Sequence, residues 1–455
     1  MKHRWRSLVI SAVVLATAGA TPALAERSAA CAKAVPGQPP TPAPTTLATV
    51  KQAYHCIFDN YYSGPVLDSR TLLVPAFAAL TQEMQRRGLD QPDATLPALT
   101  GRKTADWAAF GRVYQRISDA LPDDKAREAI GRAAIKAMVD KLDDNHARWV
   151  DTFLPGAYGL NLSVTAGPGA VDPVAAEPAY ATGIDAGSPA EKAGLKPGDE
   201  VLAVNGVPLF TNGVLNRGAL SWVTDGRIGS TAKLTVRRPA TGRTFTAAVT
   251  GARYPMSPRD ITSRLVDDDV AYVSLPGFAP DLADKVLAAI AGMRAKTQVR
   301  GVILDLRGNG GGSPDAVSKL LGSLAHGKIL GYLCDVKGRC TPKRTDDSVE
   351  LLKLPFVALT DRRCASACDS FSSAVKDLKL GTLVGTRTAG MVSGPGEMYK
   401  LDNGTLVMLP KYHGIMANKE IVNTIGVAPD HFAPTTAADL SAGRDTALDK
   451  AVSLL

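Results

Sequence analysis

The sequence is poor in aromatic residues, in basic clusters and in long apolar stretches, and each shortage excludes a class of protein. Only 5% of the residues are Phe, Trp or Tyr, which argues against a surface on which nucleic-acid bases stack. Basic residues are spread along the chain without a run, so nucleic acid is not an expected partner. Beyond the first 25 residues no apolar stretch approaches the length of a membrane span, and we expect no stable span.

What remains is the composition of a folded globular protein. Hydrophobic residues make up 45% and charged residues 21% of the chain, which excludes a disordered or fibrous protein. A chain of 455 residues is long enough for two or three domains, each with its own core.

The first 25 residues have the pattern of a secretory signal peptide. A basic start with Lys2, Arg4 and Arg6 precedes an apolar run, and Ala-Leu-Ala at 23–25 offers a cleavage site. Without these three cations the 52 basic residues fall to 49 against 44 acidic ones, a net charge of +5. We therefore expect an exported protein, either periplasmic or extracellular.

Six cysteines follow the predicted cleavage site. An even number of cysteines in an exported chain indicates disulfides, and the nearest pairs are Cys334 with Cys340 and Cys31 with Cys56. Spacing leaves the full connectivity open. It does not match a zinc site, and the sequence implies no metal and no organic cofactor.

The pattern of the chain changes three times after the signal peptide. Residues 26–48 form a Pro- and Ala-rich linker, and 49–151 have helical periodicity, clearest over 123–142. Residues 152–252 alternate as short strands with a hairpin around Thr241-Gly242. From 261 to 455 strands and helices alternate, which is typical of a layered α/β domain.

Two segments of the α/β region carry residues suited to chemistry. Ser366 follows the buried strand Phe356–Thr360 and precedes the helix Ala367–Leu378, where free N–H groups favour an oxyanion. Asp305–Ser313 holds the glycine run 310–312 at a second such junction, without the lysine of a phosphate loop. Ser366 is therefore either a nucleophile or simply a helix cap.

Together these segments resemble the C-terminal processing (tail-specific) serine peptidases. The resemblance covers roughly residues 50–455. Its carriers are the PDZ-like Gly187–Gly206, the glycine-rich Asp305–Gly312, the nucleophile turn Ala365-Ser366-Ala367 and Gly426-Val-Ala-Pro-Asp430. It implies a multidomain α/β protein with an N-terminal helical region, a PDZ-like β-rich domain and a crotonase-like or Clp-protease-like peptidase core.

One departure from the family pattern bears on the mechanism. Many members use a serine–lysine dyad, and Met391 occupies the apparent position of that lysine. Methionine cannot accept a proton. The tricorn-like branch uses a histidine before its PDZ domain, and Leu142-Asp-Asp-Asn-His146 is similar to that segment. A neutral imidazole suits a general base, although a histidine at a helix end can also face solvent.

The resemblance also implies a third catalytic residue shortly before Gly426. The matching position is Asn423, with Glu420 as an alternative, and Asn145 beside His146 is a further one. For the oxyanion hole we expect the Ala367 N–H and a glycine N–H, with Gly311 preferred over Gly310. Cys364 and Cys368 flank the serine, and a cysteine nucleophile or a redox role is a minor alternative.

The PDZ-like region has a separate expected task. Gly159-Leu160-Asn-Leu162 is similar to the loop that receives a peptide C-terminus, and the adjoining strand can pair with a peptide. The sequence thus predicts an exported serine endopeptidase acting on peptides or proteins. The alternative is a catalytically inactive, PDZ-containing peptide-binding protein of the same fold. The oligomeric state is left open.

Overall fold

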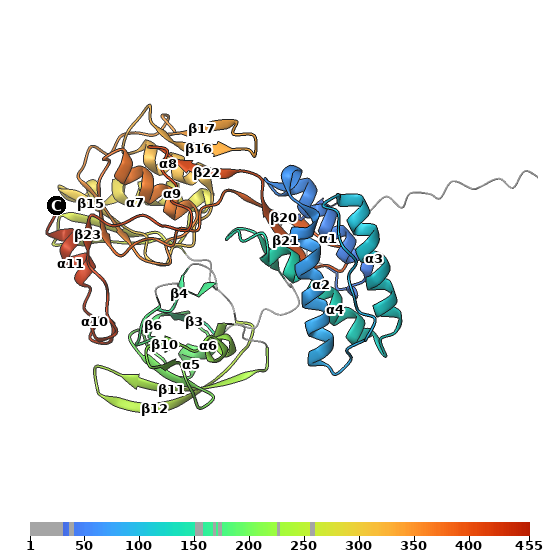
Figure 1. The fold of residues 1–455 in the computed structure, drawn as a ribbon. Helices are drawn as coiled ribbons and strands as arrows, with labels where there is room; N and C mark the ends of the chain where they lie inside the picture. The colour runs from blue at the N-terminus through green and yellow to red at the C-terminus, as the bar shows by residue number, and fades with distance from the viewer. Residues whose placement is uncertain are drawn as a thin grey trace, which may run out of the picture.

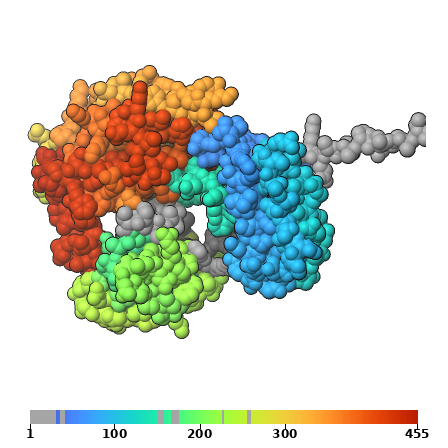
Figure 2. All heavy atoms as spheres, in the orientation of Figure 1, coloured from blue at the N-terminus to red at the C-terminus, as the bar shows by residue number. Residues whose placement is uncertain are grey.

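The computed structural model describes residues 31–35, 41–150, 158–166, 170–171, 175–224, 228–254 and 260–455. The predicted signal peptide lies outside these residues, as does part of the predicted linker. The described chain forms a helical lobe, a β-rich lobe and a larger α/β lobe (Figure 1), which Figure 2 shows mainly in blue, green and orange-red. No helix within the described ranges has both the length and the apolarity needed to cross a membrane.

The helical lobe is built from amphipathic helices that bury one face. In α4 the apolar residues recur at every fourth position, and Asp123 begins the helix by accepting from the Ala126 N–H at 2.7 Å. The predicted helix over 123–142 is confirmed with slightly shorter ends. The helices are α1 (Leu47–Asn60), α2 (Ser69–Arg86), α3 (Lys103–Asp119) and α4 (Asp124–Asp140), with a 3-10 turn η1 (Gly64–Val66).

A four-stranded sheet joins this lobe to the C-terminal half of the chain. Its strand order is β1 (Ala32–Lys33), β20 (Gly396–Lys400), β21 (Leu406–Pro410) and β2 (Arg148–Val150), all antiparallel. The β20–β21 hairpin buries Tyr399, Leu401, Val407 and Leu409 in the core of the helical lobe. The prediction placed 261–455 in one peptidase core, whereas this hairpin leaves that core and packs on the helices.

The described residues of the β-rich lobe form a four-stranded sheet, three two-stranded sheets and two short helices. Its long hairpin β11–β12 turns around Thr241-Gly242, as the sequence predicts. Its apolar core is separate from those of the other lobes. The elements are β3 (Leu160–Leu162), β4 (Thr165–Ala166), β5 (Ala170–Val171), β6 (Ala181–Ile184), α5 (Pro189–Lys192), β7 (Glu200–Val204), β8 (Val207–Pro208), β9 (Phe210–Thr211), β10 (Val214–Leu215), α6 (Arg217–Thr224), β11 (Thr231–Arg238) and β12 (Arg243–Thr250).

The α/β lobe is organised around a six-stranded sheet that is parallel except at one edge. Its order is β13 (Thr262–Val266), β14 (Val270–Ser274), β15 (Gly301–Asp305), β18 (Phe356–Thr360), β19 (Thr382–Gly385) and β23 (His431–Phe432), with β13 antiparallel. One face packs on α7 (Pro280–Arg294), α8 (Pro314–Gly322) and α9 (Ala367–Asp377), and the other on α11 (Thr446–Val452). The central strands are buried on both faces and therefore apolar throughout.

A second, three-stranded sheet lies beside α8 and α9. Its order is β17 (Cys340–Arg344), β16 (Ile329–Cys334) and β22 (His413–Met416). After β23 the chain runs to a short helix, α10 (Ala437–Ser441), beside the β-rich lobe and then returns to α11 at the main sheet (Figure 1). A cavity lies between this second sheet, α8 and the start of α9.

Candidate active site

Ser366 lies between β18 and α9 in a backbone conformation that residues other than glycine rarely adopt. Its φ is 59° and its ψ is −115°, and such a conformation costs about 1–3 kcal/mol. The N–H of Ala367, the first residue of α9, has no acceptor among the described residues. A strained strand-to-helix turn that presents a hydroxyl beside an unpaired amide fits the nucleophile of an acyl-transfer enzyme.

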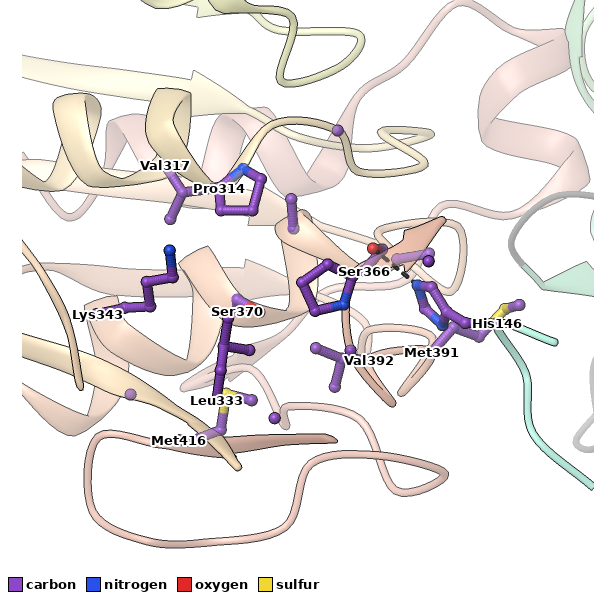
Figure 3. A pocket seen from close by; sticks show the side chains of 18 of the residues that line it. His146, Pro314, Val317, Leu333, Lys343, Ser366, Ser370, Met391, Val392 and Met416 are labelled. Carbon is purple, nitrogen blue, oxygen red and sulfur yellow. Dashed lines mark hydrogen bonds between the residues drawn. The ribbon is translucent and has the colours of Figure 1, made fainter. Parts of the chain in front are cut away.

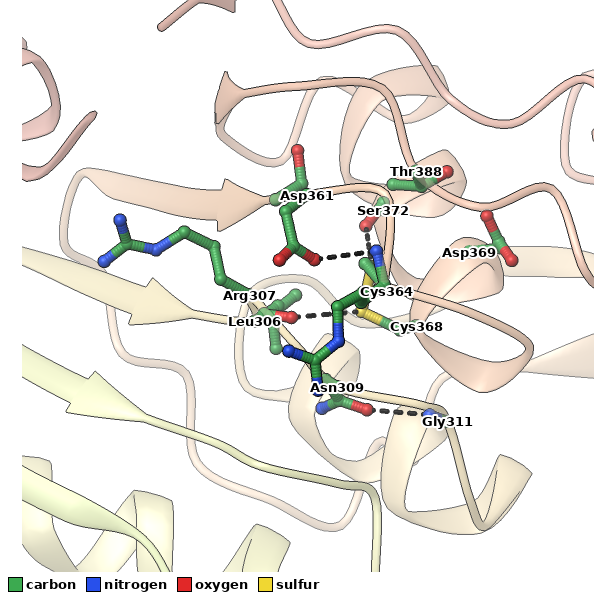
Figure 4. The surroundings of a disulfide bond; sticks show 12 residues. Leu306, Arg307, Asn309, Gly311, Asp361, Cys364, Cys368, Asp369, Ser372 and Thr388 are labelled. Carbon is green, nitrogen blue, oxygen red and sulfur yellow. Dashed lines mark hydrogen bonds between the residues drawn. A yellow bond between two sulfur atoms is a disulfide. The ribbon is translucent and has the colours of Figure 1, made fainter. Parts of the chain in front are cut away.

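A disulfide brackets this turn. Cys364 and Cys368 are fully buried and bonded to each other (Figure 4). The Ala365 N–H donates to the Asn309 carbonyl at 3.0 Å, which ties the turn to the glycine-rich segment. Because both sulfurs are in the disulfide, neither is a free thiol nucleophile in this structure. The two expected local pairs, Cys31–Cys56 and Cys334–Cys340, are also bonded.

His146, which is 220 residues away in sequence, contacts the Ser366 hydroxyl. The distance from His146 Nε2 to Ser366 Oγ is 3.0 Å (Figure 3). His146 lies six residues after the end of α4 and two residues before β2, which pairs with β21. The sheet shared between the lobes therefore carries the imidazole to the serine, and 3.0 Å is within reach for proton transfer.

Two asparagine side chains fix the tautomer of that imidazole. Asn423 Oδ1 accepts from the Val392 N–H at 2.9 Å, so the Asn145 group facing it at 2.8 Å is the amide NH₂. Asn145 Oδ1 then faces His146 Nδ1 at 2.9 Å and accepts its proton. Nε2 is left without a proton and can accept one from Ser366.

The three predicted candidates for the third residue fare differently, and Asn145 is the one that contacts the imidazole. Asn423 does not touch the imidazole and acts one step away, through Asn145. Glu420 is exposed on the preceding loop, where its backbone N–H donates to Asn418 Oδ1 and its carbonyl accepts from the Met416 N–H. The expectation for Glu420 is therefore corrected, because no described contact links its carboxylate to the site.

Burial keeps the imidazole neutral. Desolvation lowers the pKa of His146 to about 4, partly opposed by the nearby Asp144 carboxylate. Asp144 also holds the segment in place, because it accepts from the His146 N–H, from the Ser393 hydroxyl and from Tyr61 Oη. A neutral, oriented imidazole at neutral pH has the protonation state of a general base.

The N–H of Gly311, the predicted oxyanion donor of the glycine run, is not free to donate to a substrate. The Gly311 N–H donates to Asn309 Oδ1 at 2.9 Å, so it is already engaged. Gly310 and Gly312 line the cavity beside Ser366, and their N–H groups have no acceptor among the described residues. Gly311 itself has φ +102°, and a Cβ there would lie 2.7 Å from Ser366 Cβ. Its role is close packing rather than donation.

Asp369 is a site residue that the sequence analysis missed. Its fully buried carboxylate accepts from three backbone N–H groups, those of Ser366 at 2.9 Å, Gly390 at 2.8 Å and Met391 at 3.0 Å. Burial raises its pKa to about 6, although these hydrogen bonds oppose the rise. The signal in the sequence was an acid in the first turn of a helix, which reads as an ordinary helix-dipole partner.

The serine and the imidazole open onto a cavity of about 520 Å³. Its walls are mostly apolar and come from α8, β16 and β22, and from the segment around Met391. Met391 is buried and lines the same cavity (Figure 3), where the family pattern would place a lysine. A largely apolar cavity beside an oriented hydroxyl can hold one side chain of a bound peptide.

The β-rich lobe touches the nucleophile loop directly. Gly159 has φ +70° and packs against Ser188, where a Cβ would lie 2.1 Å from the serine Cβ. Leu160 and Leu162 follow in β3, which pairs with β6. Arg363, three residues before Ser366, donates to Asn161 Oδ1 and to Thr182 Oγ1, both at 3.1 Å. The strand predicted to receive a peptide is thus linked to the nucleophile turn.

Two family models match the chain in the order that the sequence analysis predicts. Residues 180–238 match a PDZ domain and residues 269–432 match peptidase family S41. The second match contains both Ser366 and the glycine-rich segment. His146 lies before both matched ranges.

Similar curated proteins are processing proteases. The carboxy-terminal processing protease CtpB of Bacillus subtilis is 24% identical over 75% of this chain and 71% of its own length. The chloroplastic carboxyl-terminal-processing peptidase 2 of Arabidopsis thaliana is 29% identical over 66% of this chain and 60% of its own. The tricorn protease of Thermoplasma volcanium is 37% identical over 29% of this chain and 12% of its own.

Solved structures show the same fold. The photosystem II D1 C-terminal processing protease superposes with a TM-score of 0.53 at 22% identity, over 85% of this chain and 93% of its own. Mature CPAF complexed with lactacystin superposes with a TM-score of 0.55 at 16% identity, over 90% of this chain and 98% of its own. The predicted fold class, with a helical region, a PDZ domain and an α/β peptidase core, is confirmed.

Proposed function

We propose, from the match of residues 269–432 to peptidase family S41 and the similarity to processing proteases, that the chain is a serine-type peptidase in which Ser366 is the nucleophile and His146 the general base. The observation that carries the proposal is the 3.0 Å contact from His146 Nε2 to Ser366 Oγ, with the tautomer fixed by Asn145. The missing lysine at Met391 is then no obstacle, because the imidazole supplies the base.

The geometry supports a two-step acyl transfer. Ser366 Oγ attacks the scissile carbonyl carbon while its proton passes to His146 Nε2. The N–H groups of Ala367 and Gly310 stabilise the oxyanion, Gly310 replacing the engaged Gly311. The imidazolium then gives its proton to the leaving amine, and the acyl-enzyme forms. Water attacks this ester, His146 takes the water's proton, and its return to Ser366 releases the product.

Asn145 and Asn423 act as positioning residues in this proposal. Neither carries a charge, so they orient the imidazole without raising its basicity as a carboxylate would. This arrangement fits a base whose pKa burial has lowered to about 4. Asp369 is a further positioning residue, since it joins the nucleophile turn to the segment that holds Asn423.

We further propose that the peptidase is exported and that its PDZ lobe recognises a segment of the substrate, such as a chain terminus. Three disulfides favour an oxidising compartment, as does the predicted signal peptide. β3 and the loop at Gly159 suit strand addition by a peptide. The names of the relatives, which are carboxy-terminal processing proteases, agree with recognition of a terminus.

Fluorophosphonate labelling followed by peptide hydrolysis tests the catalytic assignment. The wild-type protein should label at Ser366, and both Ser366→Ala and His146→Ala should lose labelling and about 10³- to 10⁶-fold in kcat/KM. His326→Ala is the matched control, because His326 is exposed and its ring hydrogen-bonds to the Val349 carbonyl, away from the described site. Hydrolysis that survives both active-site substitutions refutes the assignment. A wild-type protein that neither labels nor cleaves favours the inactive, peptide-binding alternative.

A further inference from the structure

The charged side chains that line the cavity beside Ser366 are those of cationic residues. The described residues that line it include Lys343 and Arg148 but no aspartate or glutamate. Most of the remaining wall is apolar, so little within it screens a charge. A concave site lined by one sign of charge attracts ligands of the opposite sign. The cavity therefore favours a substrate that brings a negative charge.

Lys343 is aimed into this cavity by the second sheet. It lies on the edge strand β17 and pairs with Gly331 of β16, which in turn pairs with Met416 of β22. Directly opposed residues in a sheet share a face, so the side chains of Lys343 and Met416 project on the same side of the sheet. Gly331, which lies between them, has no side chain. Figure 3 shows Lys343 and His146 at opposite ends of the pocket.

Lys343 has no ion-pair partner in the part of the chain that the structure describes. No described carboxylate lies within ion-pair distance of Lys343 Nζ, whereas neighbouring lysines of the same lobe are paired. Lys319 contacts Asp284 at 2.8 Å, and Lys376 contacts Asp430 at 3.2 Å. A half-buried ammonium group in an apolar wall is stabilised when an anion binds beside it.

We propose that Lys343 is a specificity-determining residue that binds a carboxylate of the substrate peptide, at a fixed number of residues from the scissile bond. This inference rests on the proposed function, because it names the substrate class of the same site. The carboxylate comes from an acidic side chain or from the C-terminus of the peptide. The apolar walls between Lys343 and Ser366 accept the intervening uncharged side chains.

A library of random synthetic peptides, prepared with free or with amidated C-termini, tests the proposal by mass-spectrometric mapping of the cuts. Wild-type enzyme should enrich Asp and Glu about tenfold at one position relative to the cut, or should require the free terminus there. If the preference persists in the amidated peptides, Lys343 binds a side-chain carboxylate. If the preference is lost on amidation, Lys343 binds the C-terminal carboxylate. Lys343→Met should abolish the preference, and Lys343→Glu should replace it with enrichment of Lys and Arg.

The control is Lys337→Met, which removes an exposed lysine from the turn of the same β16–β17 hairpin and should keep the wild-type profile. An identical profile for Lys343→Met and wild type overturns the inference while leaving the peptidase assignment intact. Capture of the library by immobilised Ser366→Ala protein gives a second readout that needs no turnover. Equal retention of acidic and neutral peptides in that assay also overturns the inference, even if the wild-type protein cleaves nothing.

Discussion

The two halves of the candidate site are held in place by different means. Ser366 lies in a turn that its sequence neighbours hold in place. The Cys364–Cys368 disulfide spans the turn, and the Asp369 carboxylate accepts from the Ser366 N–H. His146 is fixed by residues from elsewhere in the chain. It is held through Tyr61 and Ser393, which bind Asp144, and through Asn423, which binds Asn145.

This difference teaches that the nucleophile is built by the α/β lobe alone, whereas the base depends on how the helical lobe packs. β2 brings the imidazole into place only because the β20–β21 hairpin crosses from one lobe into the other. Changes in the serine half should therefore act on the turn itself. Changes in the histidine half should act on the alignment of the imidazole, and the substitutions below separate the two.

The largest effect is expected in the histidine half, at Asn145. Asn145→Ala removes the acceptor for the Nδ1 proton, so the imidazole can rotate or change tautomer, and kcat should fall about 10²-fold. Asn145→Asp keeps an acceptor but adds a negative charge, which should move the acid limb of kcat/KM upward from about pH 4. A kcat/KM-against-pH profile measures both. Asn418→Ala, on an exposed loop, is the control, and an unchanged kcat in Asn145→Ala would contradict the network.

The next largest effects are expected from removal of the disulfides in the two lobes. Replacing both Cys364 and Cys368 by Ala should lower the free energy of unfolding by about 2 kcal/mol and lower kcat about tenfold, because the strained turn loses its bracket. Replacing Cys31 and Cys56, which close a longer loop in the helical lobe, should cost about 3.5 kcal/mol with kcat retained. Chemical denaturation and initial rates measure the pair. The opposite ranking of the two kcat values would show that the turn needs no bracket.

Asp369 should add a pH dependence of its own. Its carboxylate accepts three N–H groups when ionised, and protonation weakens these hydrogen bonds because it removes the negative charge. Activity should therefore fall as the pH drops through about 6, the pKa of Asp369, and again near 4, where His146 becomes protonated. Asp369→Asn should lower kcat a few-fold at pH 8 and abolish only the upper limb.

Asp281→Asn, an exposed carboxylate in the first turn of α7, is the matched control for that profile. A single limb near pH 4 in both wild type and Asp369→Asn would rule out titration of Asp369 as the cause. Rescue of kcat by Asp369→Glu, which keeps the charge, separates a positioning role from a loss of packing.

The smallest effect is expected where the PDZ lobe meets the nucleophile loop. Arg363→Ala removes two hydrogen bonds to β3 and β6, each of which contributes about 1 kcal/mol at most. KM for a folded protein substrate should rise about threefold, while kcat/KM for a short peptide should change less than twofold. Arg86→Ala, exposed at the end of α2, serves as control. Equal changes for both substrates would place Arg363 in the catalytic half instead.

Short-range patterns in the sequence predicted helices and strands and the serine half of the candidate site. The apolar spacing of α4, the buried run of β18 and the small residues around Ser366 are local, so they could be read directly from the chain. The same locality explains two errors. The sequence favours Gly311 as an oxyanion donor, but the Asn309 side chain accepts from its amide. It also offers Glu420 as a third residue, but that side chain is exposed.

The amino-acid sequence by itself determined the order of the lobes, the turn that presents Ser366 and the candidacy of His146. Only the tertiary structure decided that the His146 imidazole reaches the Ser366 hydroxyl and that Asn145 lies between the imidazole and Asn423. It also decided that the Asp369 carboxylate accepts from the Met391 N–H. The physical reason is distance along the chain. Contacts between residues hundreds of positions apart depend on the packing of whole lobes, which no local periodicity encodes.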